Sequence, residues 1–459
     1  MPARFVILCM ALPCVLCVLI LPVWQDFFCM GGNVMYTYKN ARVFVGGEFI
    51  KTDISVDSGV FCASGEKHAG VFLDFNNCFI FPGFADVHVH LREPGFSYKE
   101  TIHTGTMAAA HGGYTAVCSM PNLSPVPDSK ANTEAMLHLI RKNAAVKVFP
   151  YAAITKEEKG EKLSDMEELS KLTHFFSDDG RGVQSESTMR SAMELAARLG
   201  VMIAAHCEDN AYLNGGCIRE CEFALKNGHK TINPESEWRQ VERDLRLAKE
   251  TGCKYHICHI STKESVELVR RAKKDGVDVS AETAPHYLVL TTDNIEDDGR
   301  FKMNPPIGTY SDREALREGI ADKTIDIIAT DHAPHSKEEK SGGLKNSLMG
   351  ITGLETAFPV LYTKLVEKNV ISLKRLIELL CVSPRKRFSL GGGEIRNGAP
   401  ADFTVFDLEN RFKINSAEFL SMGKSTPFDG LACRGRCLLT AVDGKIVWKA
   451  GRKNETNCF

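Results

Sequence analysis

The chain has 459 residues, of which 44% are hydrophobic and 25% are charged, a composition typical of a globular protein with a full core. Its 56 basic and 58 acidic residues nearly cancel and leave a formal charge of −2. This balance gives no electrostatic reason to expect a nucleic-acid partner or binding to an anionic membrane surface. The length permits one large barrel-type domain with a smaller satellite, or two to three ordinary domains.

Sixteen cysteines are a high count, but their placement argues against a disulfide framework. Cys78, Cys118 and Cys258 lie inside apolar, strand-like runs, where a buried free thiol is ordinary. Disulfide scaffolds belong to short secreted domains, which this chain is not. We therefore expect a reducing compartment and place the protein in the cytoplasm.

Residues 5–24 form an uncharged, apolar run whose length suits a membrane span or the core of a signal peptide. Only Arg4 is basic before this run, and no clean small-x-small cleavage site follows it. A third interpretation is an upstream extension, with the true start at Met30 or Met35. We favour this interpretation and expect residues 1–29 to lie outside the fold; a membrane anchor or signal peptide is the alternative.

Residues 30–82 are rich in strand-like sequence. Gly46 and Gly47 separate the runs 41–45 and 48–51, which predicts a hairpin. The segment is too short to form a hydrophobic core alone, so we expect it to pair with another part of the chain.

From residue 84 to about residue 331, apolar strand-like runs alternate with amphipathic helical stretches such as 187–199 and 263–274. Strands that are apolar on both faces and separated by helices predict a parallel sheet, and eight such units predict a (β/α)₈ TIM-like barrel across residues 83–393. An open, doubly wound sheet is the alternative. The eight predicted strands are 84–90, 114–120, 146–153, 174–179, 201–206, 255–260, 277–284 and 325–331.

Residues 394–459 return to strand-like sequence. Asp443 and Gly444 separate 437–442 from 445–450, a stronger hairpin signal than the first. We expect this segment and residues 30–82 to form one small composite β domain from both chain ends.

Five of the eight predicted strands end in histidine or aspartate, at the barrel edge where function gathers. An isolated His88-x-His90 pair would more often lie on a solvent-exposed strand edge than bind a metal. A single histidine would more often be a core residue with its hydrogen bonds satisfied. The whole set, however, predicts metal binding, and it comprises His88, His90, His206, His259, Asp331 and one of the neighbours Asp178 and Asp179. Four imidazoles and two carboxylates are more ligands than one tetrahedral zinc ion takes. They suit two bridged ions, with Mn²⁺ or Co²⁺ as alternatives to Zn²⁺. Such a pair favours amide hydrolysis or its reverse.

Two longer motifs resemble a known family. Residues 81–95 (FPGFADVHVHLREPG) resemble the metal-binding signature of the amidohydrolase superfamily in its dihydroorotase form, and residues 329–335 (ATDHAPH) resemble its second signature. The resemblance covers about residues 35–450. Shorter motifs follow in family order at 120–122, 178–180, 206–209, 259–262, 282–286, 304–306, 350–356 and 426–430.

The resemblance implies two zinc ions per chain, held by His88, His90, Asp179, His206, His259 and Asp331. His88, His90 and Asp331 would hold one ion, and His206 and His259 the other. Asp179 and a hydroxide would bridge them, in the position where many relatives use a carboxylated lysine. Asp331 is also the implied catalytic residue, which would move a proton to the leaving ring nitrogen.

The resemblance further implies a carboxylated substrate. Arg92, Asn122 and His335 would clamp the carboxylate, and Asn304 would bind the ring amide. A surface salt bridge for Arg92 and a simple turn role for Asn304 are the structural alternatives. The chain also departs from its relatives: residues 347–350 are Ser-Leu-Met-Gly where they usually carry Ala-Pro-Phe-Gly, so we expect a less rigid loop.

The implied activity is that of a dihydroorotase, which interconverts N-carbamoyl-L-aspartate and (S)-dihydroorotate in pyrimidine biosynthesis. One alternative is a cyclic amidohydrolase of the allantoinase or dihydropyrimidinase type, against which Arg92, Asp179 and His335 argue. The other is an inactive dihydroorotase-like scaffold for aspartate transcarbamoylase, against which the complete set of ligands argues. The resemblance leaves open a homodimer and a partnership with aspartate transcarbamoylase.

Overall fold

The computed structural model describes residues 35–62 and 70–451. The apolar run 5–24 and the alternative start at Met30 lie outside the described residues. Within the described ranges, none of the helices combines the length and the apolar character that crossing a membrane requires.

The strands that follow residue 83 are parallel and form the α/β core. They pair in two sheets, with the orders β10-β9-β8 and β11-β12-β13-β14-β15-β16. Strands such as β8 and β9 are buried along their whole length, as expected for a parallel sheet covered on both faces. Their bounds are β8 Phe84–Val89, β9 Tyr114–Ser119, β10 Lys147–Pro150, β11 Ala152–Ala153, β12 Phe175–Ser177, β13 Met202–Ala205, β14 Lys254–Ile257, β15 Val279–Thr283 and β16 Ile327–Ile328.

The two parallel sheets are in contact at both sides. Only Tyr151 separates β10 from β11, and its backbone N–H still donates to the Ser119 carbonyl at 2.9 Å. At the other side, Val89 and His332 form a parallel bridge, and the His90 N–H donates to the His332 carbonyl at 2.8 Å. The predicted run 146–153 is therefore one strand interrupted at a single residue.

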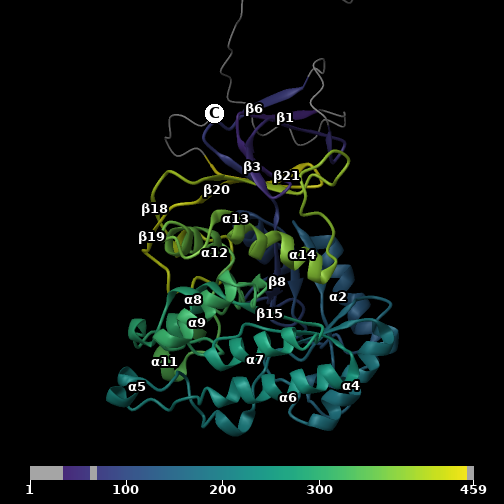
Figure 1. The fold of residues 1–459 in the computed structure, drawn as a ribbon, viewed down its shortest axis with the longest axis vertical. Coiled ribbons are helices and arrows are strands. Elements are labelled where there is room, and N and C mark those ends of the chain that lie inside the picture. The colour runs from purple at the N-terminus through teal and green to yellow at the C-terminus, as the bar shows by residue number, and fades with distance from the viewer. Residues whose placement is uncertain (1–34, 63–69, 452–459) are drawn as a thin grey trace, which may run out of the picture.

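Helices follow the strands and cover the core, as Figure 1 shows for α4, α6 and α7. The predicted helices 187–199 and 263–274 are confirmed as α4 (Glu186–Leu199) and α7 (Lys263–Lys274), capped by Ser185 and Thr262. The other long helices are α1 Ile102–His111, α2 Lys130–Asn143, α6 Glu235–Thr251 and α9 Tyr310–Ala321. The short ones are α3 Met166–Leu169, α5 Glu222–Asn227, α8 Pro285–Val289, α10 Lys337–Lys340, α11 Gly343–Asn346, α12 Ala357–Leu361, α13 Leu373–Ile377 and α14 Ser383–Phe388.

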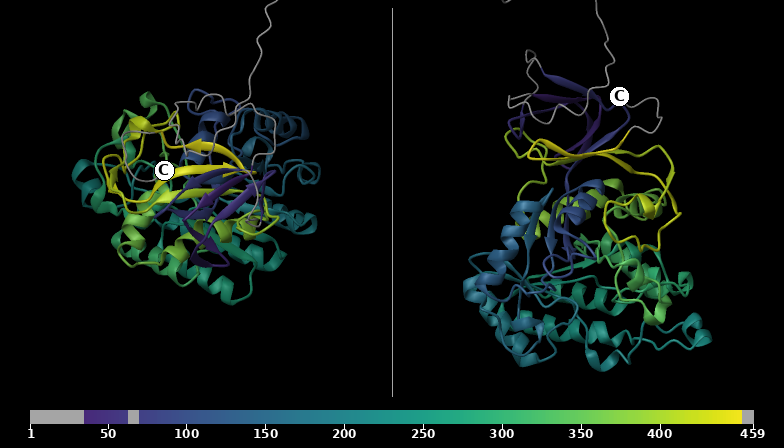
Figure 2. Two further views of the ribbon diagram at one scale, coloured as in Figure 1. Left: turned by 90° about the horizontal axis from the view of Figure 1, so that it is seen from above. Right: turned by 180° about the vertical axis from the view of Figure 1, so that it is seen from behind.

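Strands from both chain ends form a separate layer at the top of the molecule in Figure 1 and in the right-hand view of Figure 2. A six-stranded sheet has the order β21-β20-β17-β7-β2-β3, so that β7 from the first part of the chain pairs antiparallel with β17 from the last. Both predicted hairpins, β2–β3 and β20–β21, are confirmed. The sheet comprises β2 Arg42–Val45, β3 Glu48–Lys51, β7 Phe79–Pro82, β17 Phe403–Asp407, β20 Arg436–Val442 and β21 Lys445–Lys449. The domain limits at 82/83 and 393/394 stay a prediction.

Two smaller sheets complete the described strands. A four-stranded sheet has the order β5-β4-β1-β6, and β18 pairs with β19. Their bounds are β1 Tyr36–Lys39, β4 Ile54–Asp57, β5 Val60–Cys62, β6 Val71–Asp74, β18 Phe412–Lys413 and β19 Ala432–Cys433.

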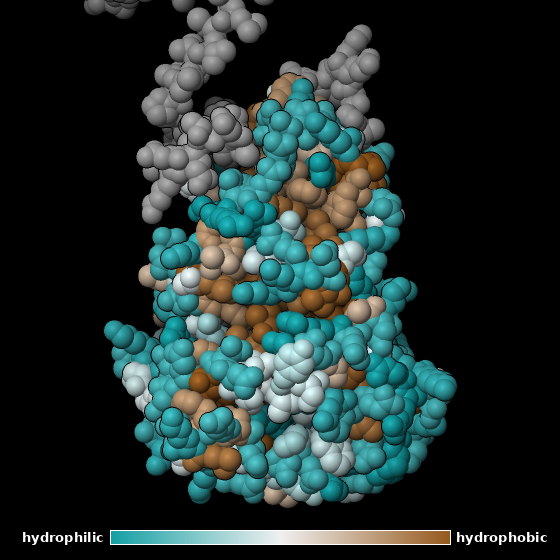
Figure 3. Space-filling model, turned by 60° about the vertical axis from the view of Figure 1, so that its left-hand side comes forward, coloured by the Kyte–Doolittle hydropathy of each residue, from teal (hydrophilic) through white to brown (hydrophobic). Residues whose placement is uncertain are grey.

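Apolar side chains join the β layer to the α/β core. Phe358 of α12 lies 5.6 Å from Phe81, 5.3 Å from Phe84 and 4.3 Å from Phe406, measured between ring centroids. On the face seen in Figure 3, hydrophobic residues gather in the upper half and hydrophilic residues cover most of the lower half. The β layer therefore has a packed base on the core that carries the site.

Candidate active site

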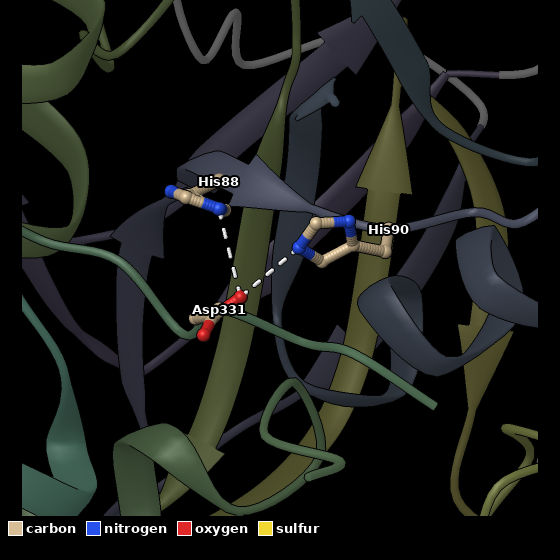
Figure 4. A group of neighbouring side chains, drawn as sticks. All are labelled: His88, His90 and Asp331. Carbon is tan, nitrogen blue, oxygen red and sulfur yellow. Dashed lines mark hydrogen bonds and ion pairs between the residues drawn. The ribbon is translucent and has the colours of Figure 1, made fainter. Parts of the chain in front are cut away.

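His88, His90 and Asp331 converge at the ends of β8 and β16 (Figure 4). The Asp331 Oδ1 atom lies 3.5 Å from His88 Nε2 and 3.1 Å from His90 Nε2. One nitrogen or oxygen from each residue lies within 4.8 Å of the others, and all three side chains are buried. Residues 241 positions apart in sequence thus form one of the groups that could hold a metal ion.

Asp179 connects this group to the remaining predicted ligands. Its Oδ1 atom lies 3.3 Å from His88 Nε2, 3.7 Å from His259 Nε2 and 3.8 Å from His206 Nδ1. Its Oδ2 atom lies 3.5 Å from His90 Nε2. A single carboxylate therefore faces all four histidines, which is the position that a bridging ligand requires.

Asp178, which the residues alone left as an equal candidate, is turned away from the histidines. Its carboxylate accepts the backbone N–H groups of Ile154 at 2.8 Å and Thr155 at 3.0 Å, as well as the Thr155 hydroxyl. These bonds tie the end of β12 to the segment after β11. Asp178 thus stabilises the strand end, and only Asp179 is available to the cluster.

The donor set fits a metal. The Nδ1 atom of His206 lies 3.1 Å from the Nε2 atom of His259, so two imidazole edges face each other. His88 Nε2 and Asp179 Oδ1 are buried and have no hydrogen-bond partner among the described residues. Buried polar atoms without a partner are costly, and imidazole and carboxylate groups are ordinary ligands of Zn²⁺ and similar ions.

The backbone is unusual at three of the predicted site residues. Arg92, His259 and Asp331 have φ values of 61°, 32° and 48°, in the left-handed region that side chains other than glycine rarely adopt. Such conformations cluster at functional sites, where the surrounding structure holds them. They also explain why β16 covers only Ile327–Ile328, whereas residues 325–331 were predicted as a strand: the chain leaves the ladder as it turns to present Asp331.

Glu282 of β15 is a site residue that sequence reasoning did not assign. Its Oε1 atom lies 2.8 Å from His88 Nδ1, and its Oε2 atom lies 3.1 Å from His256 Nε2. Burial raises the pKa of Glu282, but the adjacent His88 and His256 outweigh burial and lower the pKa to about 2. A carboxylate that accepts the Nδ1–H of His88 leaves Nε2 free to face Asp179 and Asp331. Its place near the end of a predicted strand was the available signal.

Asn122 supports His90 in a similar way. Its side-chain oxygen lies 2.9 Å from His90 Nδ1, so His90 also presents Nε2 to Asp331. Burial raises the pKa of Asp331, but the hydrogen bond from His90 and the charges of neighbouring histidines lower it below the ordinary range. Asp331 is therefore an anion at neutral pH.

A pocket of about 210 Å³ opens beside this cluster. His88 lies beneath it and is completely buried. Gly180, Ala333, Met349 and Gly350 contribute to the wall. Every other predicted site residue lines the pocket, namely His90, Arg92, Asn122, Asp179, His206, His259, Asn304, Asp331 and His335.

Arg92 brings a guanidinium group with no direct ion-pair partner among the described residues to the pocket. Its Nε–H donates to the Pro334 carbonyl at 3.2 Å, and its Nη2 lies 3.4 Å from His335 Nε2. Within the part of the chain that the structure describes, no carboxylate lies within ion-pair distance of the guanidinium. The surface salt bridge considered as an alternative is therefore wrong for the described residues, and the group suits an anionic ligand.

Asn304 and His335 form the rest of the polar wall. The Asn304 amide donates to Glu208, a contact that a simple turn residue would not require. His335 Nε2 lies 2.8 Å from the Met349 carbonyl, and its Nδ1 lies 3.0 Å from Glu339. Burial and the charges of Arg92 and Lys99 lower the pKa of His335 to about 3, so His335 is neutral at pH 7.

Comparisons with known proteins show which sequences and folds this chain is similar to. A family model described as "Dihydro-orotase-like" matches residues 78–265. A dihydroorotase of Bacillus cytotoxicus is 48% identical over 421 residues, which cover 90% of this chain and 98% of that protein. A dihydroorotase of Anoxybacillus flavithermus is 49% identical over 412 residues, covering 88% and 96% of the two chains.

Solved structures share the fold. An L-hydantoinase (dihydropyrimidinase) from Arthrobacter aurescens has a TM-score of 0.81 and 26% identity, and the alignment covers 91% of this chain and 96% of that one. A dihydropyrimidinase from Brevibacillus agri has a TM-score of 0.80 and 20% identity, and the alignment covers 91% of this chain and 95% of that one. At this identity the similarity is one of fold alone.

Proposed function

Because this chain belongs to the dihydroorotase family, we propose that it interconverts N-carbamoyl-L-aspartate and (S)-dihydroorotate for pyrimidine biosynthesis. It is a cyclic amide hydrolase, and the open question is which cyclic amide it accepts. The observation that carries the proposal is Arg92, a guanidinium without a carboxylate partner among the described residues, on the wall of the pocket that also contains Asp179 and Asp331. Both proposed reactants carry a carboxylate that such a group binds.

We further propose that the parallel strands close into a (β/α)₈ barrel. The Val89–His332 bridge and the continuity of the chain at Tyr151 support closure. In a barrel of this kind the strand ends meet at one mouth, which is where the histidine and aspartate residues lie.

The proposed cofactor is a pair of Zn²⁺ ions, one held by His88, His90 and Asp331 and the other by His206 and His259, with Asp179 shared. When bound, such a pair polarises an amide carbonyl and lowers the pKa of water. Glu282 and Asn122 orient the histidines by accepting their outward Nδ1–H groups. In ring opening, water adds to the ring amide carbonyl and the ring C–N bond breaks. Asp331 would accept a proton from that water at its carboxylate and deliver it to the ring nitrogen that leaves. Ring closure consumes one proton overall, so lower pH favours dihydroorotate.

Ring closure tests the proposal directly. Purified protein supplied with Zn²⁺ is expected to convert N-carbamoyl-L-aspartate to dihydroorotate and to leave allantoin and dihydrouracil unchanged. Faster turnover of either control would replace the proposal with the allantoinase or dihydropyrimidinase alternative. Two metal ions per chain support an enzyme, and none would support the inactive scaffold.

Three further proposals concern the cell. Buried cysteines such as Cys118, Cys207 and Cys258 are free thiols, which supports a reducing compartment and hence the cytoplasm. A homodimer and an aspartate transcarbamoylase partner stay proposals, and sedimentation of the protein alone and with the transcarbamoylase tests both.

A further inference from the structure

Lys340 is a buried amine beside the pocket that neither the motifs nor the proposed chemistry uses. It is the last residue of α10, and only 8% of its surface is exposed. Its Nζ atom donates to three backbone carbonyls, those of Lys302 at 3.0 Å, Leu348 at 2.7 Å and Gly350 at 2.7 Å. An ammonium group has three N–H donors, so every donor is used on the backbone.

The three carbonyls belong to two segments that form the pocket wall. Lys302 lies two residues before Asn304, and Leu348 and Gly350 flank Met349. The Gly350 N–H also donates to the Lys302 carbonyl at 3.0 Å, which ties the same two segments together. Lys340 itself lies five residues after His335, whose Nε2 bonds the Met349 carbonyl. One amine therefore sits where the segments of Asn304, His335 and Gly350 meet.

Gly350 makes the wall sensitive to small displacements. Its φ of 132° is one that other residues rarely adopt. A Cβ atom placed there would lie 2.7 Å from the Ala333 carbonyl oxygen and 3.1 Å from His335 Cδ2. The loop thus packs directly against the segment between Asp331 and His335. A displacement of Gly350 would therefore disturb its packing against Ala333 and His335.

A lysine is a poor choice if this position served packing alone. Burial and the charge of Lys302 lower the pKa of Lys340 to about 7, so the site is an unfavourable one for an ammonium. An apolar side chain of similar volume would fill the space without that penalty. What an apolar side chain cannot do is hold three carbonyls in a fixed arrangement. The Lys340 amine provides such an anchor for the Leu348 and Gly350 carbonyls.

We propose that Lys340 is a positioning residue for the substrate: its amine holds the loop 347–350 against the Asn304 and His335 segments, so that the binding wall is formed before the substrate arrives. The inference rests on the proposed function, because it concerns how the carboxylated substrate is bound. It leaves the metal ligands untouched, since Lys340 contacts backbone atoms outside the histidine and aspartate cluster.

Two variants and one control test this role. Lys340→Met keeps the length and removes the donors, and Lys340→Gln keeps two N–H donors. Lys345→Met is the matched control, because Lys345 lies in α11, directly before the loop 347–350, and its side chain is exposed. For each protein we would measure kcat and KM for N-carbamoyl-L-aspartate, metal content, Tm, and the hydrogen exchange of the peptide covering residues 341–352.

The expected result is a split between the kinetic constants. Lys340→Met should raise KM about tenfold and change kcat less than about threefold, because the binding wall is lost and the chemistry is not. Lys340→Gln should lie between it and the wild type. Metal content should not change, and amides of residues 341–352 should exchange at least about tenfold faster in Lys340→Met. The Leu348 N–H donates to the Glu339 carbonyl and the Gly350 N–H to the Lys302 carbonyl, and both bonds depend on the loop staying in place. Lys345→Met should match the wild type in every measurement.

Three outcomes would overturn the inference: an unchanged KM in Lys340→Met, a fall in kcat alone, or the unfolding of both Lys340 variants, which would assign the residue to the fold. Failure of the proposed function is recognised separately, because the wild type would then fail to close N-carbamoyl-L-aspartate. The hydrogen-exchange comparison would still report whether Lys340 holds the loop.

Discussion

The two sides of the pocket are built by different means. His88 lies near the end of β8, Asp179 and Asp331 follow β12 and β16, and the three side chains contact one another. Arg92 and His335 lie on loops, and they are held by backbone carbonyls, those of Pro334 and Met349. Parallel strands place their ends through the whole ladder, whereas a loop takes its shape from a few local hydrogen bonds. The strand side suits chemistry that needs fixed atoms, and the loop side suits recognition.

This contrast predicts that variants on the two sides of the pocket will change different kinetic constants. Changes to the strand side should reduce kcat and metal content, because the cluster has no substitute ligands. Changes to the loop side should raise KM and leave the metal in place.

Asp331→Ala should reduce turnover by about 1,000-fold or more, because the carboxylate that moves the proton is removed. Metal content should fall only partly, since the other proposed ligands remain. Asp326→Asn is the matched control, because Asp326 directly precedes β16 and bonds Lys273 instead of a histidine. Turnover in Asp331→Ala within tenfold of the wild type would contradict the assigned role.

The neighbouring aspartates offer a sharper comparison within the strand side. Asp179→Asn should weaken metal binding by about 100-fold or more, because even supporting residues of metal ligands commonly contribute 10- to 100-fold. Asp178→Asn should retain the metal and lose about 1–3 kcal/mol of stability, since its carboxylate accepts three hydrogen bonds from Ile154 and Thr155. Metal analysis and Tm measured on both variants decide the assignment, and equal metal loss in the two would refute it.

The same contrast explains what could be predicted from the sequence. The spacing of His88 and His90 and the placement of His206, His259 and Asp331 at strand ends indicated the cluster, because strand periodicity fixes where a side chain lies. The choice between Asp178 and Asp179 could not be made from residues alone, because it depends on which carboxylate meets the Ile154 and Thr155 amides.

Other parts of the site were beyond sequence reasoning for similar reasons. Glu282 orients His88, which lies 194 positions away in the sequence, and no local sequence pattern predicts a contact over that separation. The three hydrogen bonds of Lys340 go to backbone carbonyls, which every residue carries. The identity of the partner residues therefore could not be predicted from the sequence. In the β layer, by contrast, both hairpins followed from their glycine-containing turns, because turn geometry is a local property.

On the loop side, Arg92→Met should raise KM for N-carbamoyl-L-aspartate by about 30- to 100-fold, because a charge-assisted bond to a carboxylate is lost in a partly buried pocket. Metal content should equal that of the wild type. Arg92→Lys should recover only part of the loss, since an ammonium keeps the charge and lacks the planar fork. An unchanged KM in Arg92→Met would remove the carboxylate clamp from the proposal and with it the main argument for this substrate.

The smallest expected effect concerns the pH dependence of stability at Lys340. Burial and Lys302 lower the pKa of this amine from 10.5 to about 7, against the opposing charges of Asp298 and Glu339. Between pH 7 and 10.5 the unfolded chain therefore binds a proton that the folded chain does not, and this protonation is an advantage of the unfolded state. The neutral amine of the folded chain has two N–H donors, so in this window it holds two of the three carbonyls. As the pH rises through this window, that advantage disappears and the folded wild type becomes more stable relative to Lys340→Met, which has no such proton. The Tm difference between wild type and variant should thus shift in favour of the wild type by a few degrees between pH 7 and pH 9. A difference that stays constant across this range would mean that the three carbonyls keep the amine charged throughout, and the loop would then be anchored equally at every pH.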